Sequence, residues 1–204
     1  MTGRAVVDGQ SGFTLAELLV VIAVTGLIMA GLASLLISGQ QSYLQGSNQV
    51  EAQQNARVAI EPMMQEVRGA GYNPTNATFD AVTAQSASGF TLQNDWNGNG
   101  GIEPGISVTV GGITRGEQVT YSLSGTTLRR QESVLDSAPQ PIAQVQQLTL
   151  QYLDASGAVT TTAANIRTVV VTLQAEPDNQ PAASPQGRVV VNVTDRARLR
   201  NRGN

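Results

Sequence analysis

The most regular feature of the chain is an unbroken apolar run near its N-terminus. Residues 18–37 carry no charge, and most of them are Leu, Ile, Val, Ala or Met. An α-helix rises about 1.5 Å per residue, so twenty residues cover roughly 30 Å, the hydrocarbon thickness of a bilayer. The pattern predicts a membrane-spanning helix over residues 13–37, with Glu17 at its N-terminal edge.

The helical pattern continues beyond this run but changes character. Residues 38–71 become polar, and from Ala56 onward apolar side chains recur at three- and four-residue spacing. Such spacing places side chains on one face of a helix. We expect this apolar stripe to pack on a sheet formed by the rest of the chain; its members are Ala56, Ile60, Met63, Val67 and Ala70.

From residue 75 onward the sequence is typical of β-structure, with short alternating segments rich in Val and Thr. Ser124-Gly125 lies between two of these segments and indicates a hairpin. Val145, Leu148, Leu150 and Tyr152 are the expected inward-facing residues of another segment. The predicted strands are 78–83, 89–93, 106–110, 118–123, 126–131, 145–153, 166–175 and 188–194. The fold class is therefore α+β, a long N-terminal helix packed on an antiparallel sheet.

The amino-acid composition argues against several classes of enzyme and metal site. The 204 residues include no Cys and no His, and every basic residue is Arg. The commonest zinc and copper ligands and the usual Ser-His and Cys-His nucleophile pairs are therefore missing. We expect no enzymatic activity. A net charge of −3 gives no general attraction to nucleic acid.

A specific motif opens the apolar run: Gly12-Phe13-Thr14-Leu15-Ala16-Glu17-Leu18. It resembles the N-terminus of type IV prepilins and of type II secretion pseudopilins. The resemblance implies that residues 1–12 are a leader peptide and that prepilin peptidase cuts between Gly12 and Phe13. It also implies that the new amine of Phe13 is N-methylated, and that the protein is held in the inner membrane before it enters a filament.

Two other interpretations of the same stretch remain open. An ordinary secretory signal has an apolar core of about 7–15 residues followed by small residues at the cleavage site. Residues 30–33 fit such a site, although the core here is longer. A plain single-pass anchor would need no Gly-Phe junction.

Later segments extend the resemblance. Residues 60–72, 119–130 and 148–154 are similar to parts of PilW-type minor pilins, where a long helix ends in Arg-x-Ala-Gly-Tyr. The resulting division is a leader at 1–12, a helix at 13–71 and a β-rich periplasmic or extracellular domain at 72–204. The helix is transmembrane over 13–37 and amphipathic over 38–71.

Glu17 is the first candidate functional residue. Cleavage before Phe13 would create an ammonium group one helical turn from the Glu17 carboxylate. A carboxylate at membrane depth costs on the order of 3 kcal/mol on insertion scales and usually has a partner. We expect Glu17 to pair with its own amine or that of a neighbouring subunit during assembly. The alternative is an interfacial residue that reaches the lipid headgroups.

A second candidate is a short loop similar to the start of a calcium-binding loop. Asp95, Asn97 and Asn99 supply oxygens at alternate positions, and glycine occupies the sixth position. The twelfth position is Ile106 instead of a bidentate acid, so Glu103 would have to substitute. Calcium is the one cofactor that the sequence suggests. The alternative is a glycine-rich turn without an ion.

The third candidate is basic. Arginine alternates with other residues at the C-terminus, and an extended strand would place these side chains on one face. Such a face could bind DNA phosphates or an acidic subunit. A solvated, fraying tail is the alternative. The residues are Arg196, Arg198, Arg200 and Arg202.

These observations lead to three functional hypotheses. The first is a structural minor pilin that assembles into, or primes, a type IV pilus. Its expected partners are prepilin peptidase/N-methyltransferase, other major and minor pilins, the assembly platform and the membrane. The second is a J-like pseudopilin of a type II secretion system. The third is a membrane-anchored protein that binds calcium through the Asp95 loop or DNA through the arginines.

Overall fold

The structure is a computed structural model that describes residues 12–178 and 188–201. By its internal contacts the chain divides into two compact units, Met1–Leu44 and Gln45–Asn204. The contacts thus group the second half of the long helix with the sheet, whereas the sequence-based division separates helix from sheet at residue 71. Each unit is described here by itself.

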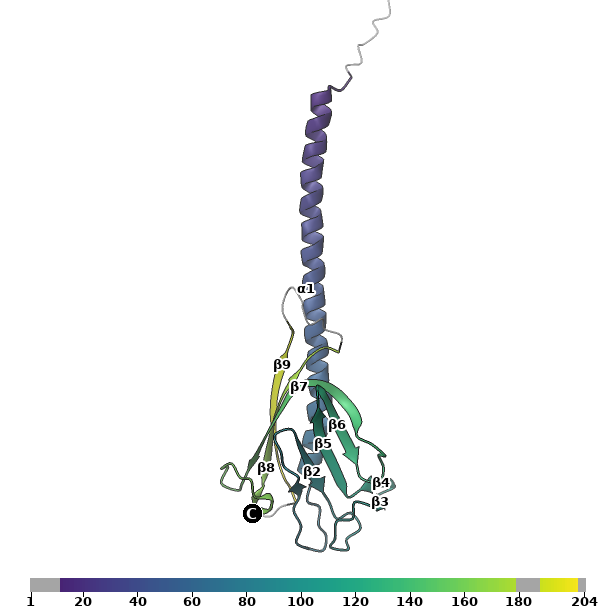
Figure 1. Cartoon of the computed structure of the whole chain (residues 1–204), viewed down its shortest axis with the longest axis vertical. Helices are drawn as coiled ribbons and strands as arrows, with labels where there is room; N and C mark the ends of the chain where they lie inside the picture. Colours follow the sequence, from purple (N-terminus) through teal and green to yellow (C-terminus); the bar gives the residue numbers. More distant parts are fainter. Residues whose placement is uncertain (1–11, 179–187, 202–204) are drawn as a thin grey trace, which may run out of the picture. The chain divides into compact units, whose positions relative to one another are not determined.

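One helix, α1 (Leu15–Gly69), accounts for the N-terminal part of the chain (Figure 1). It continues through Pro62 and ends where the sequence becomes rich in glycine. The amide of Ala70 donates to the carbonyl of Val67 at 3.2 Å, which tightens the last turn. Gly71 follows with a φ of 81°, a conformation that stops a helix and that glycine adopts without strain.

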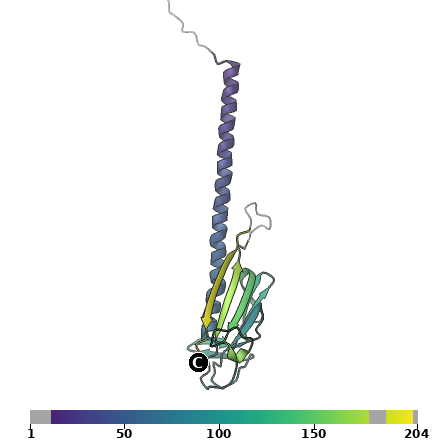
Figure 2. The ribbon, with the colours of Figure 1, turned by 90° about the vertical axis from the view of Figure 1, so that its left-hand side faces the viewer.

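The larger unit contains a seven-stranded antiparallel sheet in the order β1-β2-β5-β6-β7-β8-β9 (Figure 1). Strands β7, β8 and β9 lie side by side in Figure 2, coloured green to yellow. A separate two-stranded sheet pairs β3 with β4. A short 3-10 helix, Ala163–Asn165, precedes β8. The strands are β1 (Val82–Thr83), β2 (Gly89–Gln93), β3 (Ser107–Val110), β4 (Ile113–Gly116), β5 (Gln118–Ser124), β6 (Thr127–Glu132), β7 (Gln140–Leu153), β8 (Thr168–Ala175) and β9 (Val191–Arg198).

The predicted hairpin between β5 and β6 is confirmed. Ser124 pairs with Thr127, and Gly125 in the turn has a φ of 61°. The predicted and observed strand bounds differ most at three strands. β1 is shorter than predicted, β9 runs over Val191–Arg198 instead of 188–194, and β7 begins at Gln140 instead of Val145. The early part of β7 contains Pro141, which a sequence-based assignment reads as a strand breaker, and its pairing with β6 shifts register.

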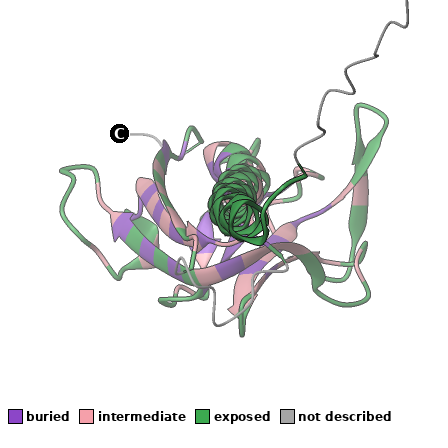
Figure 3. Ribbon diagram, turned by 90° about the horizontal axis from the view of Figure 1, so that it is seen from above, coloured by how far each residue is buried: buried purple, intermediate pink, exposed green. Residues whose placement is uncertain are grey.

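The core forms where the helical stripe meets one face of the sheet. All five predicted stripe residues are buried, and so are the four predicted inward residues of β7. Figure 3 shows buried positions alternating with more exposed ones along the strands, as expected for a sheet with one covered face. The fold-class prediction, a long helix packed on an antiparallel sheet, is confirmed.

A polar contact joins the helix to the sheet beside this core. The hydroxyl of Tyr121 donates to Oε2 of Glu66 at 2.7 Å. Arg130 donates to the same carboxylate from Nε at 3.0 Å and from Nη2 at 2.8 Å. Burial, and next the nearby Glu66 charge, raise the pKa of Tyr121. Burial also raises the pKa of Tyr152. Both phenols are therefore held in the neutral form.

These shifts predict a loss of stability at alkaline pH. A group with a raised folded-state pKa contributes its stability fully below its unfolded pKa, about 10 for tyrosine, and loses it as the pH rises further. We expect the free energy of unfolding of the detergent-solubilised chain to stay constant with respect to these groups below about pH 10 and to fall as the pH rises above it. Urea titrations followed by fluorescence of Trp96, the single tryptophan, measure it.

Tyr121→Phe is the matched variant. It lacks the ionisable hydroxyl, so its unfolding free energy should fall less steeply over the same pH range. At neutral pH it should be less stable by about 1–3 kcal/mol, because Glu66 loses a charge-assisted hydrogen bond. Equal pH slopes for the two proteins would contradict the assignment to Tyr121.

Candidate functional site at the helix start and the Asp95 loop

The first turn of α1 is closed by a reciprocal pair of hydrogen bonds between Thr14 and Glu17. The amide of Glu17 donates to Oγ1 of Thr14 at 3.2 Å. In return, the amide and the hydroxyl of Thr14 each donate to Oε2 of Glu17 at 2.9 Å. This arrangement is a capping box, in which a Thr before the helix and a Glu three residues later satisfy two otherwise unpaired helix donors. The Thr-x-x-Glu pattern of residues 14–17 is the sequence signature of such a box, which the sequence-based prediction for Glu17 did not include.

The capping box leaves Glu17 able to accept a cation as well. A carboxylate offers about four acceptor positions, and Thr14 occupies two of them on one oxygen. Phe13, the expected first residue after cleavage, directly precedes Thr14 and is 84% exposed. An ammonium group created there would therefore lie next in sequence to the residue that already contacts Glu17.

The helical part of the first unit is apolar and uncovered. Every residue from Leu15 to Leu44 is exposed, including a continuous series of Leu, Ile and Val side chains. By length and composition, α1 is sufficient to cross a membrane. Burying large aliphatic side chains stabilises by about 1.5–3 kcal/mol each, so this surface favours an apolar environment.

The second candidate, the Asp95 loop, is defined here as residues 94–106. Asp95 lies two residues beyond the end of β2 and is fully buried. Its carboxylate accepts hydrogen bonds from the amides of Gly98 at 2.7 Å, Asn99 at 3.1 Å and Gly100 at 3.0 Å. The hydroxyl of Thr75 donates to the same carboxylate at 3.3 Å. The loop therefore wraps around a buried negative charge.

The structure brings the other predicted calcium ligands together in the same loop. Asn97 donates to Oε2 of Glu103 at 2.8 Å, and Asn99 donates to Oε1 at 2.5 Å. These two hydrogen bonds, the one from Asn99 first, hold the pKa of Glu103 below its usual value. The side-chain amides thus stabilise the charged form of an exposed carboxylate.

Glu117 is a functional neighbour that the sequence analysis missed. It is fully buried and accepts hydrogen bonds from the amides of Trp96 at 3.1 Å and Glu103 at 2.8 Å. It therefore links two separate points of the Asp95 loop, Trp96 and Glu103. No local pattern marks it, because its partners lie fourteen or more residues away in the chain.

The geometry of the loop leaves calcium binding as a prediction. Within residues 12–178 and 188–201 no group of three or more His, Cys, Asp or Glu side chains is placed to hold a metal ion. The Asp95 oxygens face backbone amides, and a cation would compete with these donors. Amide oxygens of Asn97 and Asn99 would have to complete the ligand set.

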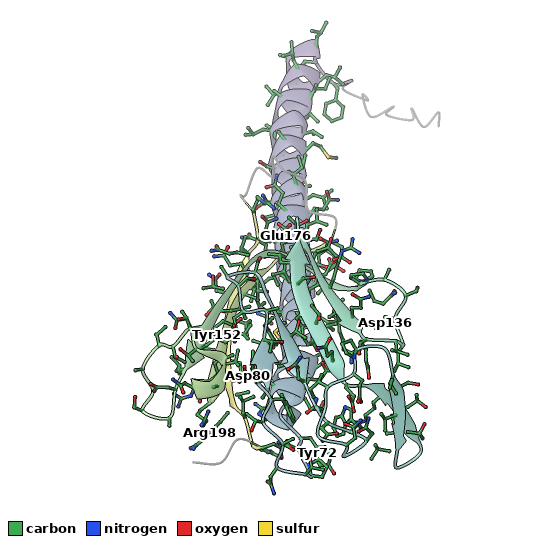
Figure 4. The ribbon with its side chains drawn as sticks, turned by 60° about the horizontal axis from the view of Figure 1, so that its bottom comes forward. Tyr72, Asp80, Asp136, Tyr152, Glu176 and Arg198 are labelled. Atoms are coloured by element: carbon green, nitrogen blue, oxygen red, sulfur yellow. The ribbon has the colours of Figure 1, made fainter. Side chains whose placement is uncertain are left out.

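The arginines of the third candidate separate into two groups. Arg196 and Arg198 are exposed on β9, at alternate positions and hence on one face; Figure 4 labels Arg198. Arg200 lies beyond the strand, where its amide donates to the carbonyl of Arg68 at 3.2 Å. Its side chain lines a cleft of about 660 Å³ with Arg68 and Tyr72, among others. Arg202 lies outside the described residues.

Comparisons with known proteins bear mainly on the first candidate. Residues 8–33 match the family model described as the prokaryotic N-terminal methylation motif. Among solved structures, a type IV-like pilin from Thermus thermophilus is 14% identical, with a TM-score of 0.45; the match covers 74% of this chain and 97% of that one. No curated protein matches the sequence. The chain therefore carries a prepilin-type N-terminal methylation motif, and its first helix begins within that motif.

Proposed function

We propose that the protein is a structural minor pilin. It is cleaved between Gly12 and Phe13, N-methylated at Phe13 and held in the inner membrane by residues 13–37, with the sheet domain in the periplasm. It then assembles into a type IV pilus or primes its assembly. The observation that carries this proposal is the methylation motif at residues 8–33, which places Glu17 in the first turn of an uncovered apolar helix.

The chemistry of Glu17 supports an assembly role. In an apolar environment an unpaired carboxylate is costly, and an ammonium group at the same depth is the natural partner. Thr14 stabilises the carboxylate within one subunit, and the acceptor positions that remain allow a second contact. A subunit entering a bundle of helices would therefore gain a paired charge that the isolated helix lacks.

The expected partners follow from this pathway. They are prepilin peptidase/N-methyltransferase, other major and minor pilins and the pilus assembly platform. The similarity of residues 60–72 to PilW-type minor pilins favours the pilus over other filaments. A J-like pseudopilin of a type II secretion system shares the motif and the helix, so it remains the alternative. Deleting the assembly platform of each machine in turn would show which one exports the protein.

The first test is the mature N-terminus of the protein purified from membranes of its own cells. Intact-mass and terminal-peptide mass spectrometry should find a chain that begins at N-methylated Phe13. The unprocessed chain should accumulate in cells that lack prepilin peptidase. A start at Met1 would instead indicate a plain anchor, and a start near Ser34 would indicate an exported soluble protein.

Substitutions at Glu17 and Thr14 separate charge pairing from helix capping. Glu17→Gln keeps a side chain that completes a capping box but removes the charge. We expect it to insert into the membrane and fold normally, yet to be incorporated poorly into filaments. Thr14→Ala weakens the cap by about 0.5–2 kcal/mol but keeps the charge, so its incorporation should be reduced less. Normal incorporation of Glu17→Gln, measured in sheared filaments, would disprove charge pairing.

Calcium binding by the Asp95 loop is a second candidate, because Asp95, Asn97, Asn99 and Glu103 share one loop. With two carboxylates we expect a weak site, with a Kd of about 10⁻⁴–10⁻³ M. Calorimetry of the full chain in detergent should show calcium binding that Glu103→Gln weakens. Asp154→Asn, in a different turn, serves as the control. Absence of heat at millimolar calcium would rule out the site.

A further inference from the structure

The Asp95 loop contains both Asn-Gly dipeptides of the chain, Asn97-Gly98 and Asn99-Gly100. Asparagine followed by glycine is chemically labile, because glycine has no side chain to hinder attack by its backbone nitrogen on the preceding side-chain amide. Asn97 and Asn99 are both exposed to solvent. The loop therefore holds two adjacent sites at which the side chain could react with its own backbone.

The reaction is deamidation through a cyclic imide. The backbone nitrogen of the glycine loses its proton and attacks Cγ of the asparagine, forming an N–Cγ bond. The Cγ–Nδ2 bond breaks, and the nitrogen leaves as ammonia after it takes up a proton. Water then opens the imide to aspartate or isoaspartate. Water is the one co-reactant, and no oxidant or reductant is required.

Asp95 opposes the loss of the glycine amide proton at both sites. The amide of Gly98 donates to its Oδ1 at 2.7 Å, and the amide of Gly100 donates to its Oδ2 at 3.0 Å. A fixed negative charge that accepts a hydrogen bond disfavours loss of that proton. Because Asp95 is fully buried, water does not screen this effect. One carboxylate thus holds both nucleophiles in their unreactive, protonated form.

Glu103 opposes the attack of the glycine nitrogen on Cγ at both sites. It accepts one hydrogen bond from Nδ2 of Asn97 and another from Nδ2 of Asn99. The carbonyl oxygens of these side chains accept hydrogen bonds from the amides of Asn99 and Gly101, each at 2.8 Å. Both ends of each side-chain amide are therefore fixed. Rotation toward the glycine nitrogen would break these bonds.

We propose that Asn97 and Asn99 are latent deamidation sites that Asp95 and Glu103 protect in the folded protein. The protection is shared, so it fails cooperatively. Conversion of Asn97 to an acid places a second carboxylate against Glu103 and removes one donor to it. The repulsion loosens Glu103 from Asn99, and reaction at the second site becomes faster than at the first.

The test measures deamidation in the full-length chain in detergent at neutral pH. Peptide mapping by mass spectrometry separates the products at Asn97 and Asn99 over time. The folded protein should react about tenfold or more slowly than the same protein unfolded in urea, the factor expected when a charge-assisted hydrogen bond on the reacting group is lost. Equal rates in the folded and unfolded chains would overturn the proposal without any variant.

Two variants identify the protecting groups. Glu103→Gln and Asp95→Asn should each accelerate deamidation at both sites by about tenfold in the folded chain. The control is Asp154→Asn, because the Asp154 carboxylate accepts hydrogen bonds from backbone amides in a separate turn that contains no Asn-Gly. It should leave both rates unchanged. Near-ultraviolet circular dichroism verifies folding; folded variants with wild-type rates would assign the protection to something other than these carboxylates.

Discussion

The packing of a single helical stripe against one face of the sheet is the constraint on which the larger unit depends. Met63 and Val67 of α1 are fully buried in one cluster with Val169 and Leu173 of β8. Within the described residues α1 is the one α-helix, so the same element that carries the methylation motif also completes the core. A chain truncated before residue 71 would lack the helix, and the face of the sheet that the helix covers would become exposed. The methylation motif and part of the core therefore lie on one secondary-structure element.

The polar contact among Glu66, Tyr121 and Arg130 fixes the position of the helix along the sheet. Apolar surfaces tolerate sliding, whereas a carboxylate held by a phenol and a guanidinium has a fixed position. Forming this contact takes three polar side chains partly out of water, which costs free energy. Each side chain makes a hydrogen bond that offsets this cost. The register between helix and sheet is thereby set at one point along α1, near its C-terminal end.

Local patterns predicted the features that depend on periodicity or on short motifs. The spacing of Ala56 to Ala70 gave the buried stripe, and Ser124-Gly125 gave the hairpin. β4 was missed because its partner among the described residues is β3 alone, and its four residues show no apolar alternation. The Asp95 loop was predicted from the spacing of its oxygen-bearing residues, but the role of Glu117 was not. Its hydrogen bonds join segments that are distant in sequence, and no periodicity encodes such contacts.

In the proposed assembly, the capping box reduces what pairing with a cation would contribute to the stability of the Glu17 carboxylate. If the carboxylate were unsatisfied in the isolated subunit, any cation in a neighbouring helix would be strongly favoured. Thr14 already supplies two hydrogen bonds, so pairing contributes only the difference between the capped and the doubly satisfied carboxylate. Under the proposed function, a small difference would allow a subunit to remain in the membrane before assembly and to be released afterwards. Selection of the proposed Phe13 amine would then rest on its position beside Thr14 more than on the strength of the attraction.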